Sequence, residues 1–195
     1  MTLIAISLSL LAGGALLVPP AGAKRVLLEL RDRVQASTTL ARLNQKVVLS
    51  AGTFVGTVND FGRIKGDLRL PDTTTTMRLA GIGLADVTIG FPPTKAVRGS
   101  LNLGSMSVRA TATQLILIRK VAPLGLPVNL VGTRCSTSNS VAISFHGQIA
   151  PPGIVTVSGV YTVPPFSHCQ GVAAALDLAV SGPGNTFTGT LSPRS

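Results

Sequence analysis

The chain is poor in the side chains that stack on bases, ionise or catalyse. Among its 195 residues there is no Trp, one Tyr and six Phe, and only seven residues are Asp or Glu. Proteins that hold single-stranded nucleic acid stack its bases on aromatic side chains, so the scarcity of these residues argues against a nucleic-acid partner. The scarcity of acids likewise limits carboxylate chemistry to a few isolated positions.

The two histidines belong to no recognisable catalytic pattern. A Ser-His-Asp triad needs a histidine that a carboxylate orients beside an exposed serine, and the sequence has no G-x-S-x-G motif. His146 alternates with the apolar Phe145, so we expect it on the solvent face of a strand, and we expect His168 in a loop beside Cys169. We therefore predict no catalytic residues and a protein that is not an enzyme.

Cofactor and metal motifs are incomplete as well. Residues 81–86 contain two glycines and an aspartate, but they lack the third glycine and the following helix of a dinucleotide-binding motif. The Gly-Pro-Gly turn at 182–184 has a proline where a phosphate loop would need a backbone N–H. His168 and the cysteines lack the second half of a zinc-ligand set. We predict no cofactor and no metal.

Basic residues, in contrast, are plentiful. All 17 Lys and Arg follow residue 23, and the net charge is +10. They are spaced singly, for example at Arg31, Arg69, Arg98 and Arg134, whereas nucleic-acid binders concentrate them. The charge favours an anionic surface outside the cell, such as acidic cell-wall polymer or lipid head groups, or it serves solubility. We predict such a surface or another envelope protein as the partner, and no nucleic acid.

The first 23 residues predict export. Residues 3–18 are almost wholly apolar or small, and Ala21-Gly22-Ala23 matches the site at which secretory signals are cleaved. Cleavage would leave residues 24–195 as a single β-domain. A retained membrane anchor is the alternative, because the apolar run is only slightly shorter than a spanning helix and Lys24-Arg25 follows it. No cysteine precedes residue 24, so we expect a secreted or envelope-associated protein without a lipid anchor.

The only two cysteines are Cys135 and Cys169. Two cysteines in an exported chain most simply pair with each other, so we predict one disulfide. On the chain-entropy account, closing a loop of this size stabilises the fold by about 3–4 kcal/mol. The stretch between them contains two alternating strands around a Pro-Pro-Gly turn at 151–153.

Alternation of apolar and polar residues predicts strands along most of the chain. The expected strands span residues 53–58, 64–70, 85–91, 97–103, 106–112, 115–118, 145–149, 157–161 and 186–191. Residues 24–45 fit a helix or strands, and we choose strands because Ser37-Thr38-Thr39 favours them. Residues 172–180 alternate like a strand, although their alanines also permit a short helix.

A glycine stands at the centre of six predicted strands, each time between two large residues of the same face. The six are Gly56, Gly66, Gly99, Gly147, Gly159 and Gly189. A missing Cβ relieves crowding on the concave side of a coiled sheet, so we place these glycines on a concave, apolar face. Together with the short hairpins they predict an all-β fold, an antiparallel meander forming a strongly coiled barrel or a two-sheet sandwich.

Several segments resemble those of uncharacterised secreted β-rich proteins of actinobacteria. The segments span residues 40–47, 123–132, 161–169 and 181–188. The similarity covers most of the chain after the signal, and its motifs concern turns and the cysteines. The resemblance carries no assigned function, catalytic residue or ligand.

Two functions remain open. The first is a non-catalytic structural or binding module of the cell envelope that uses a basic outer face. The alternative is a carrier that encloses an apolar ligand, such as a lipid or isoprenoid, in a barrel cavity. An apolar cavity of several hundred Å³ would favour the carrier, and a filled interior would favour the module. From the sequence alone we favour the module, because the glycines can serve curvature only.

Overall fold

The structure is a computed structural model that describes residues 26–79 and 82–194. The predicted signal at 1–23 lies outside the described residues. No helix among the described residues is long and apolar enough to cross a membrane.

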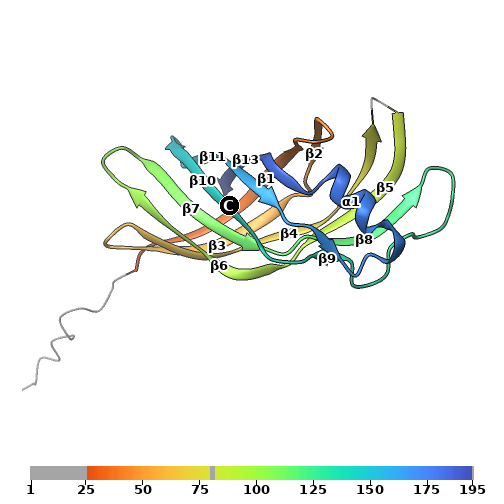
Figure 1. Cartoon of the computed structure of the whole chain (residues 1–195). Coiled ribbons are helices and arrows are strands. Elements are labelled where there is room, and N and C mark those ends of the chain that lie inside the picture. The colour runs from red at the N-terminus through yellow and green to blue at the C-terminus, as the bar shows by residue number, and fades with distance from the viewer. Residues whose placement is uncertain (1–25, 80–81, 195) are drawn as a thin grey trace, which may run out of the picture.

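Thirteen strands and a short helical segment make up the fold (Figure 1). The strands are β1 (Val26–Leu40), β2 (Gln45–Val48), β3 (Gly52–Asn59), β4 (Arg63–Leu79), β5 (Ile82–Phe91), β6 (Pro93–Asn102), β7 (Ser107–Gln114), β8 (Leu117–Pro123), β9 (Ser136–Thr137), β10 (Val141–Ala150), β11 (Ile154–Val163), β12 (Phe166–Ser167) and β13 (Gly182–Pro193). A 3-10 turn, Gln170–Val172, leads into the helix α1, Ala173–Ala179.

Eight of the strands close into an antiparallel barrel. Its order, β1-β3-β4-β6-β7-β10-β11-β13, follows the chain, and β13 pairs with β1 to complete the circle. The predicted all-β meander is confirmed, and it takes the barrel form instead of the sandwich. The expected hairpins β3–β4, β6–β7 and β10–β11 are present.

The pairing register sets the width of the barrel. Paired residues followed around the barrel from Thr38 of β1 lead back to β1 at Leu28, ten residues earlier. With eight strands, this offset corresponds to a strand tilt of about 40° for ordinary strand rise and spacing. At a given number of strands, a barrel with more strongly tilted strands is wider. Its interior is hollow unless large side chains fill it.

The two ends of the barrel are built differently. At one end the chain makes short turns at 60–62, 103–106 and 151–153, and β1 begins and β13 finishes there; we call this end the mouth. At the other end the four connections carry β2, β5, β8 with β9, and β12 with α1; we call these elements the cap. Figure 1 shows α1, β5, β8 and β9 together, away from the hairpin tips of β6–β7 and β3–β4.

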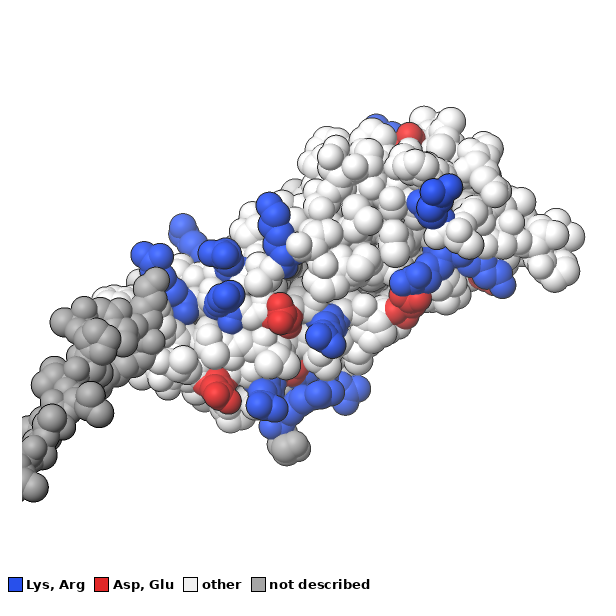
Figure 2. Space-filling view, turned by 90° about the horizontal axis from the view of Figure 1, so that it is seen from below, with Lys and Arg blue, Asp and Glu red and all other residues white. Residues whose placement is uncertain are grey.

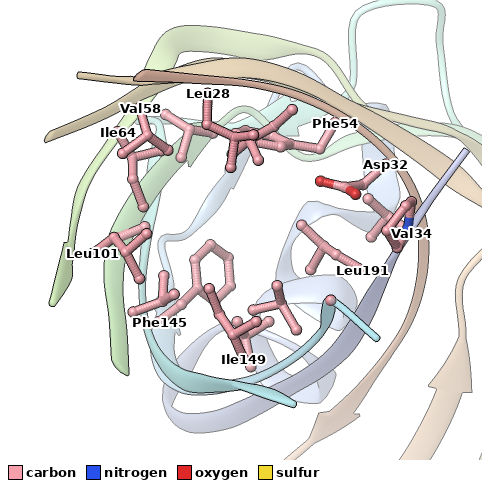
Figure 3. Close-up of a pocket in the computed structure, with 18 of the residues that line it drawn as sticks. Leu28, Asp32, Val34, Phe54, Val58, Ile64, Leu101, Phe145, Ile149 and Leu191 are labelled. Atoms are coloured by element: carbon pink, nitrogen blue, oxygen red, sulfur yellow. The ribbon is translucent and has the colours of Figure 1, made fainter. Parts of the chain in front are cut away.

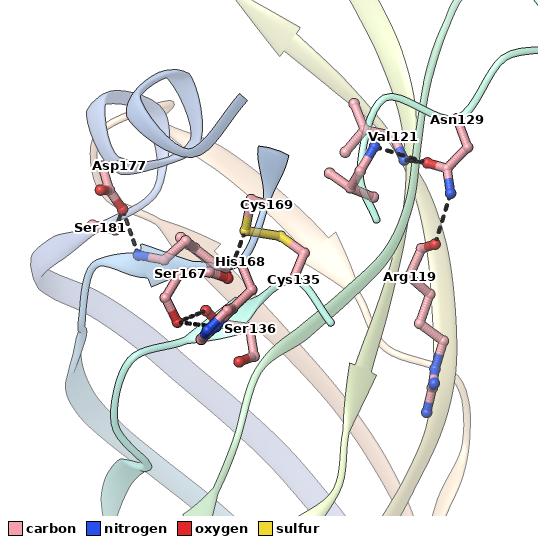
Figure 4. Close-up of a disulfide and its surroundings, with 12 residues drawn as sticks. Arg119, Val121, Asn129, Cys135, Ser136, Ser167, His168, Cys169, Asp177 and Ser181 are labelled. Carbon is pink, nitrogen blue, oxygen red and sulfur yellow. Dashed lines mark hydrogen bonds between the residues drawn. A yellow bond between two sulfur atoms is a disulfide. The ribbon is translucent and has the colours of Figure 1, made fainter. Parts of the chain in front are cut away.

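Long strands join the cap to the barrel. β4 pairs with β6 through its first residues and with β5 from Leu70 onward, where a bulge redirects it. The cap sheet then continues as β5-β8-β9-β12. The predicted disulfide between Cys135 and Cys169 is present, and it joins the segments that hold β9 and β12 (Figure 4). It therefore links two cap connections that leave the barrel at different strands.

The helix α1 settles the ambiguous stretch 172–180 in favour of the helical alternative. Val172, Leu176 and Val180 recur at four-residue spacing and pack against the core, whereas Leu178 is exposed. Asp177 of this helix accepts hydrogen bonds from the Phe166 backbone N–H (2.6 Å) and the Ser181 hydroxyl (2.9 Å) (Figure 4). Tertiary contacts therefore decide between the two periodicities.

Two strand predictions need correction. Residues 115–118 are not one strand: Leu115 and Ile116 connect β7 to β8, which begins only at Leu117. Ile116 and Ile118 are nevertheless buried, which explains the apolar run. In the segment 24–45, the described part from Val26 is a strand as chosen, but β1 ends at Leu40 and a turn precedes β2.

Candidate ligand-binding cavity in the barrel

The mouth half of the barrel encloses an apolar cavity of about 560 Å³ (Figure 3). Side chains that face inward alternate with outward ones along every strand, and the inward set from β1, β3, β4, β6, β7, β10, β11 and β13 forms the wall. Phe54, Val58, Ile64, Phe145 and Leu191 are among them. Ligand pockets in proteins are usually apolar hollows of about 300–1,000 Å³, so this cavity has an ordinary size for a small-molecule site.

Two aromatic rings form the floor of the cavity. Phe145 of β10 and Phe187 of β13 lie with ring centroids 5.0 Å apart and an interplanar angle of 56°. Gly159 of β11 pairs with Phe145 on one side and with Phe187 on the other. A side chain between two rings on adjacent strands would crowd them, so glycine allows the two phenyl groups to meet.

A third phenyl ring, that of Phe54, covers a pair of glycines in the wall. Gly56 and Gly66 lie opposite each other on β3 and β4. A Cβ on Gly56 would come within 2.9 Å of the Phe54 ring, and one on Gly66 within 2.7 Å of it. The Phe54 ring therefore occupies the space that these two residues leave.

The remaining predicted glycines also lie between wall residues. A Cβ on Gly189 would lie 3.1 Å from the Phe187 ring, one on Gly99 2.7 Å from Ala110, and one on Gly147 2.9 Å from Val157. Each of the six glycines alternates in its strand with residues that line the cavity, apart from Tyr161 beyond Gly159. Neighbouring strands and phenyl rings thus fill the space that the glycines leave. The open cavity lies closer to the mouth.

Asp32 of β1 is the acidic side chain that the barrel turns toward its interior. It is 7% exposed, and Figure 3 shows its carboxylate pointing into the cavity between Phe54 and Leu191. Within residues 26–79 and 82–194, no hydrogen bond or salt bridge to this carboxylate is formed, and its oxygens keep surface that faces open space. Burial raises the pKa of the Asp32 carboxyl above its usual range.

Sequence reasoning did not single out Asp32. Alternate residues of a strand point to the same face, and Asp32 alternates with Leu30, Val34 and Ala36. Its side chain is therefore expected to point inward once β1 is known to be a strand. An acid at an inward position of an alternating strand is the signal that could have identified it. The helix-or-strand ambiguity of residues 24–45 obscured that signal.

The rim of the mouth is apolar and exposed. Its exposed apolar residues are Val26, Leu27 and Leu28 on β1, Phe61 in the β3–β4 turn, Leu103 and Met106 at the β6–β7 turn, and Ile154 on β11. Leu28, Leu103 and Met106 also line the cavity, so the cavity reaches the surface at this end. Glu29, Arg31 and Arg194 also border this opening, so an entering apolar molecule would pass both apolar and charged side chains.

A smaller cavity of about 250 Å³ lies under the cap. Apolar residues of β2, β5, β8 and α1 surround it, and Tyr161 closes it toward the barrel. The Tyr161 hydroxyl lies 2.6 Å from the Thr38 hydroxyl in the buried interior. Burial raises the pKa of Tyr161, and the hydrogen bond with Thr38 partly opposes that change.

The histidines lie apart from both cavities. His146 is exposed on the outer face of β10, where its Nε2 lies 3.1 Å from the Ser158 hydroxyl of β11. His168 is exposed beside the disulfide and contacts the Ser167 hydroxyl. No group of three or more His, Cys, Asp or Glu in the described part of the chain could hold a metal ion.

The outside of the barrel carries a basic face to which β1, β4, β6 and β7 contribute cations. Figure 2 shows a face of the molecule on which basic residues predominate over acidic ones. The exposed cations on these strands are Arg31, Arg33, Arg63, Lys65, Arg69, Arg98 and Arg109. Exposed acids on the same strands are Glu29, Asp67 and Asp72. The one salt bridge among the described residues, Arg119 to Asp72, belongs to the cap, so these cations stay free for external anions.

No protein-family model, curated protein or solved structure matches the chain. The functional argument therefore rests on the cavity, its buried carboxylate Asp32 and the basic exterior.

Proposed function

We propose that the protein is a non-catalytic binding module that carries an apolar ligand in the barrel cavity. The observation that carries this proposal is the apolar hollow of about 560 Å³, which opens at the mouth and ends on the Phe145–Phe187 floor. Several hundred Å³ of apolar space is what separates a carrier from a filled structural barrel. The cavity thus favours the alternative over the structural module that the sequence alone favoured.

We also propose that the carrier works outside the cell or in its envelope. The disulfide between Cys135 and Cys169 is compatible with an oxidising compartment. Membership in the uncharacterised actinobacterial group and cleavage after Ala23 are parts of this proposal that rest on the sequence.

The test is to fill the cavity without changing the outer surface. Leu191→Trp places an indole in the cavity wall, and Leu101→Trp does the same from β6. Val160→Trp, on the exposed side of β11, is the matched control. Native mass spectrometry of protein purified without denaturation, and titration with a neutral apolar dye, would measure occupancy.

We expect each filling variant to lower dye affinity at least about tenfold, while Val160→Trp binds like the wild type. Urea unfolding of all four proteins shows that the filling variants still fold. Equal binding by folded Leu191→Trp, Leu101→Trp and wild type would contradict a ligand site in the barrel.

A second candidate function concerns the exterior. The basic face and the exposed apolar rim lie on the same barrel, and together they fit an anionic lipid bilayer. We propose this surface as the docking site of the carrier. The apolar rim favours lipid over a wall polymer, because a soluble polyanion offers nothing for Phe61, Leu103 and Met106 to enter.

A further inference from the structure

Asp32 places a buried charged group in the otherwise largely apolar wall of the cavity. Asp32 is more than nine-tenths buried, its carboxylate points into the cavity, and it makes no hydrogen bond within the described residues. A buried polar group without a partner is costly, so a protein that keeps one usually satisfies it with a ligand or water.

The surroundings of Asp32 offer no internal donor. Across the sheet it pairs with Phe54 of β3 and Pro193 of β13, and a proline has no N–H to donate. Among the residues that line the cavity, the charged ones besides Asp32 are Glu29, Arg31 and Arg194, and these three are exposed at the rim. The carboxylate is therefore available to whatever occupies the hollow.

We propose that Asp32 recognises the polar head of an amphiphilic ligand, and that the head is a hydrogen-bond donor, either a hydroxyl or an ammonium group. The rest of that ligand is apolar and extends toward the Phe145–Phe187 floor. This inference rests on the proposed carrier function and names the class of molecule that it takes.

The chemistry excludes the opposite class of head group. An ionised carboxylate only accepts hydrogen bonds, and it repels a second anion more strongly in an apolar hollow than in water. Fatty acids and lipid phosphates therefore fit poorly at this point. A hydroxyl or ammonium group forms a charge-assisted hydrogen bond there, which is stronger than a neutral one.

The distance to the floor suits an extended chain. Pro193, the partner of Asp32, is six residues along β13 from Phe187, which amounts to roughly 20 Å of strand. The strand tilt reduces this separation to roughly 15 Å along the barrel axis. An alkyl chain of medium length or a small polycyclic body can span that interval with its head at Asp32.

The experiment compares four probes that share one alkyl chain: decanol, decylamine, decyl methyl ether and decanoate. Each is titrated by calorimetry at mildly alkaline pH into the wild-type protein and into Asp32→Leu and Asp32→Asn. Asp67→Asn removes an exposed carboxylate from the outer face of β4 and serves as the control.

We expect the wild type to bind decanol or decylamine at least about tenfold more tightly than the ether, because the ether has no hydrogen to donate to the Asp32 carboxylate. Decanoate should bind most weakly, because the Asp32 carboxylate repels its charge. The arm that binds best distinguishes hydroxyl from ammonium. Asp32→Leu should bind the ether and decanoate at least as well as the alcohol, and Asp67→Asn should keep the wild-type order.

Equal binding of all four probes by the wild type, unchanged in Asp32→Leu, would overturn the role of Asp32 and leave the carrier function intact. Failure of every probe with every variant, together with failure of the neutral dye, would instead overturn the carrier function itself.

Discussion

At the scale of single residues, Asp32 is in an environment that opposes its ionised form. The surrounding wall is apolar, and desolvation by burial raises the pKa of the carboxyl from its ordinary value of 3.8. Between that value and the raised pKa, the folded protein holds a proton that the unfolded chain has released. Folding is therefore penalised as the pH rises through this window, and the penalty persists above it.

Replacement of Asp32 by Asn should remove this penalty. We expect the wild-type free energy of unfolding to fall as the pH rises through the window above 3.8, and Asp32→Asn to lack that fall. At neutral pH the variant should then melt at a higher temperature than the wild type. Urea unfolding as a function of pH, with Asp67→Asn as the control, measures the difference. A steeper pH dependence in Asp32→Asn would contradict the account.

Gly159 makes a second prediction at this scale. A Cβ at this position would meet the backbone carbonyl oxygen of Ser144 on β10, which cannot rotate away, and would lie 3.5 Å from the Phe145 ring. Gly159→Val should therefore overpack the floor and cost about 1–3 kcal/mol in unfolding free energy.

Chemical denaturation of Gly159→Val beside Gly171→Ala would test it. Gly171 lies in the cap, and a Cβ there meets nothing within 4 Å, so that substitution should be nearly neutral. Wild-type stability in Gly159→Val would show that the floor is looser than the ring contacts indicate.

At the scale of elements, the part of the cap formed by β9, β12 and α1 depends on few regular contacts. β9 and β12 each contain two residues, and α1 contains seven. Such short elements hold their places through cross-links: the disulfide, the Asp177 carboxylate, and the Asn129 amide, which accepts from the Val121 N–H at 3.0 Å (Figure 4). Short pieces without these links would gain too little burial to remain ordered.

Removal of the disulfide should therefore affect stability strongly. Cys135 and Cys169 are 34 residues apart, and on the chain-entropy account Cys169→Ser should lower the unfolding free energy by about 3–4 kcal/mol. Thermal melting of the variant and of reduced wild type should agree. Hydrogen exchange should show the loss first in β9, β12 and α1, with the barrel amides affected less. Uniform loosening of the barrel would contradict the division into barrel and cap.

At the scale of the whole molecule, the same barrel carries the basic outer face and the apolar cavity. The net charge is +10, and seven exposed cations lie on the outer side of β1, β4, β6 and β7, on the same barrel as the apolar rim. Figure 2 shows basic residues predominating on one face of the molecule. Basic groups near an anionic bilayer each contribute about 1 kcal/mol to attraction, which salt screens.

Liposome binding tests the docking surface. We expect co-sedimentation with vesicles that contain phosphatidylglycerol, weak binding to pure phosphatidylcholine, and loss of binding at high salt. Arg63→Glu with Arg109→Glu should abolish it, and Arg119→Glu, in the cap, should change it little. Binding to soluble teichoic acid with the same salt dependence, but not to vesicles, would favour a wall polymer and contradict the lipid surface.

The sequence by itself determined the local features of this protein. The alternation of β3, β4 and β10 depends only on neighbours along the chain, so the hairpins could be predicted, and the disulfide could be predicted because the chain has only two cysteines. The glycines could be assigned to the same strand face as their large neighbours, because side-chain direction in a strand repeats every second residue.

Only the tertiary structure decided the closure, the hollow and the carboxylate. Whether a coiled meander becomes a barrel depends on the register that pairs β13 with β1, in which Thr38 lies opposite Phe187 from the far end of the chain. Whether the interior is filled depends on how inward side chains from eight strands pack together, and no local sequence pattern determines that packing. In the sequence, Asp32 does not differ from the other acidic residues. It becomes a candidate ligand-binding group only because distant apolar strands surround it and leave its charge without a partner.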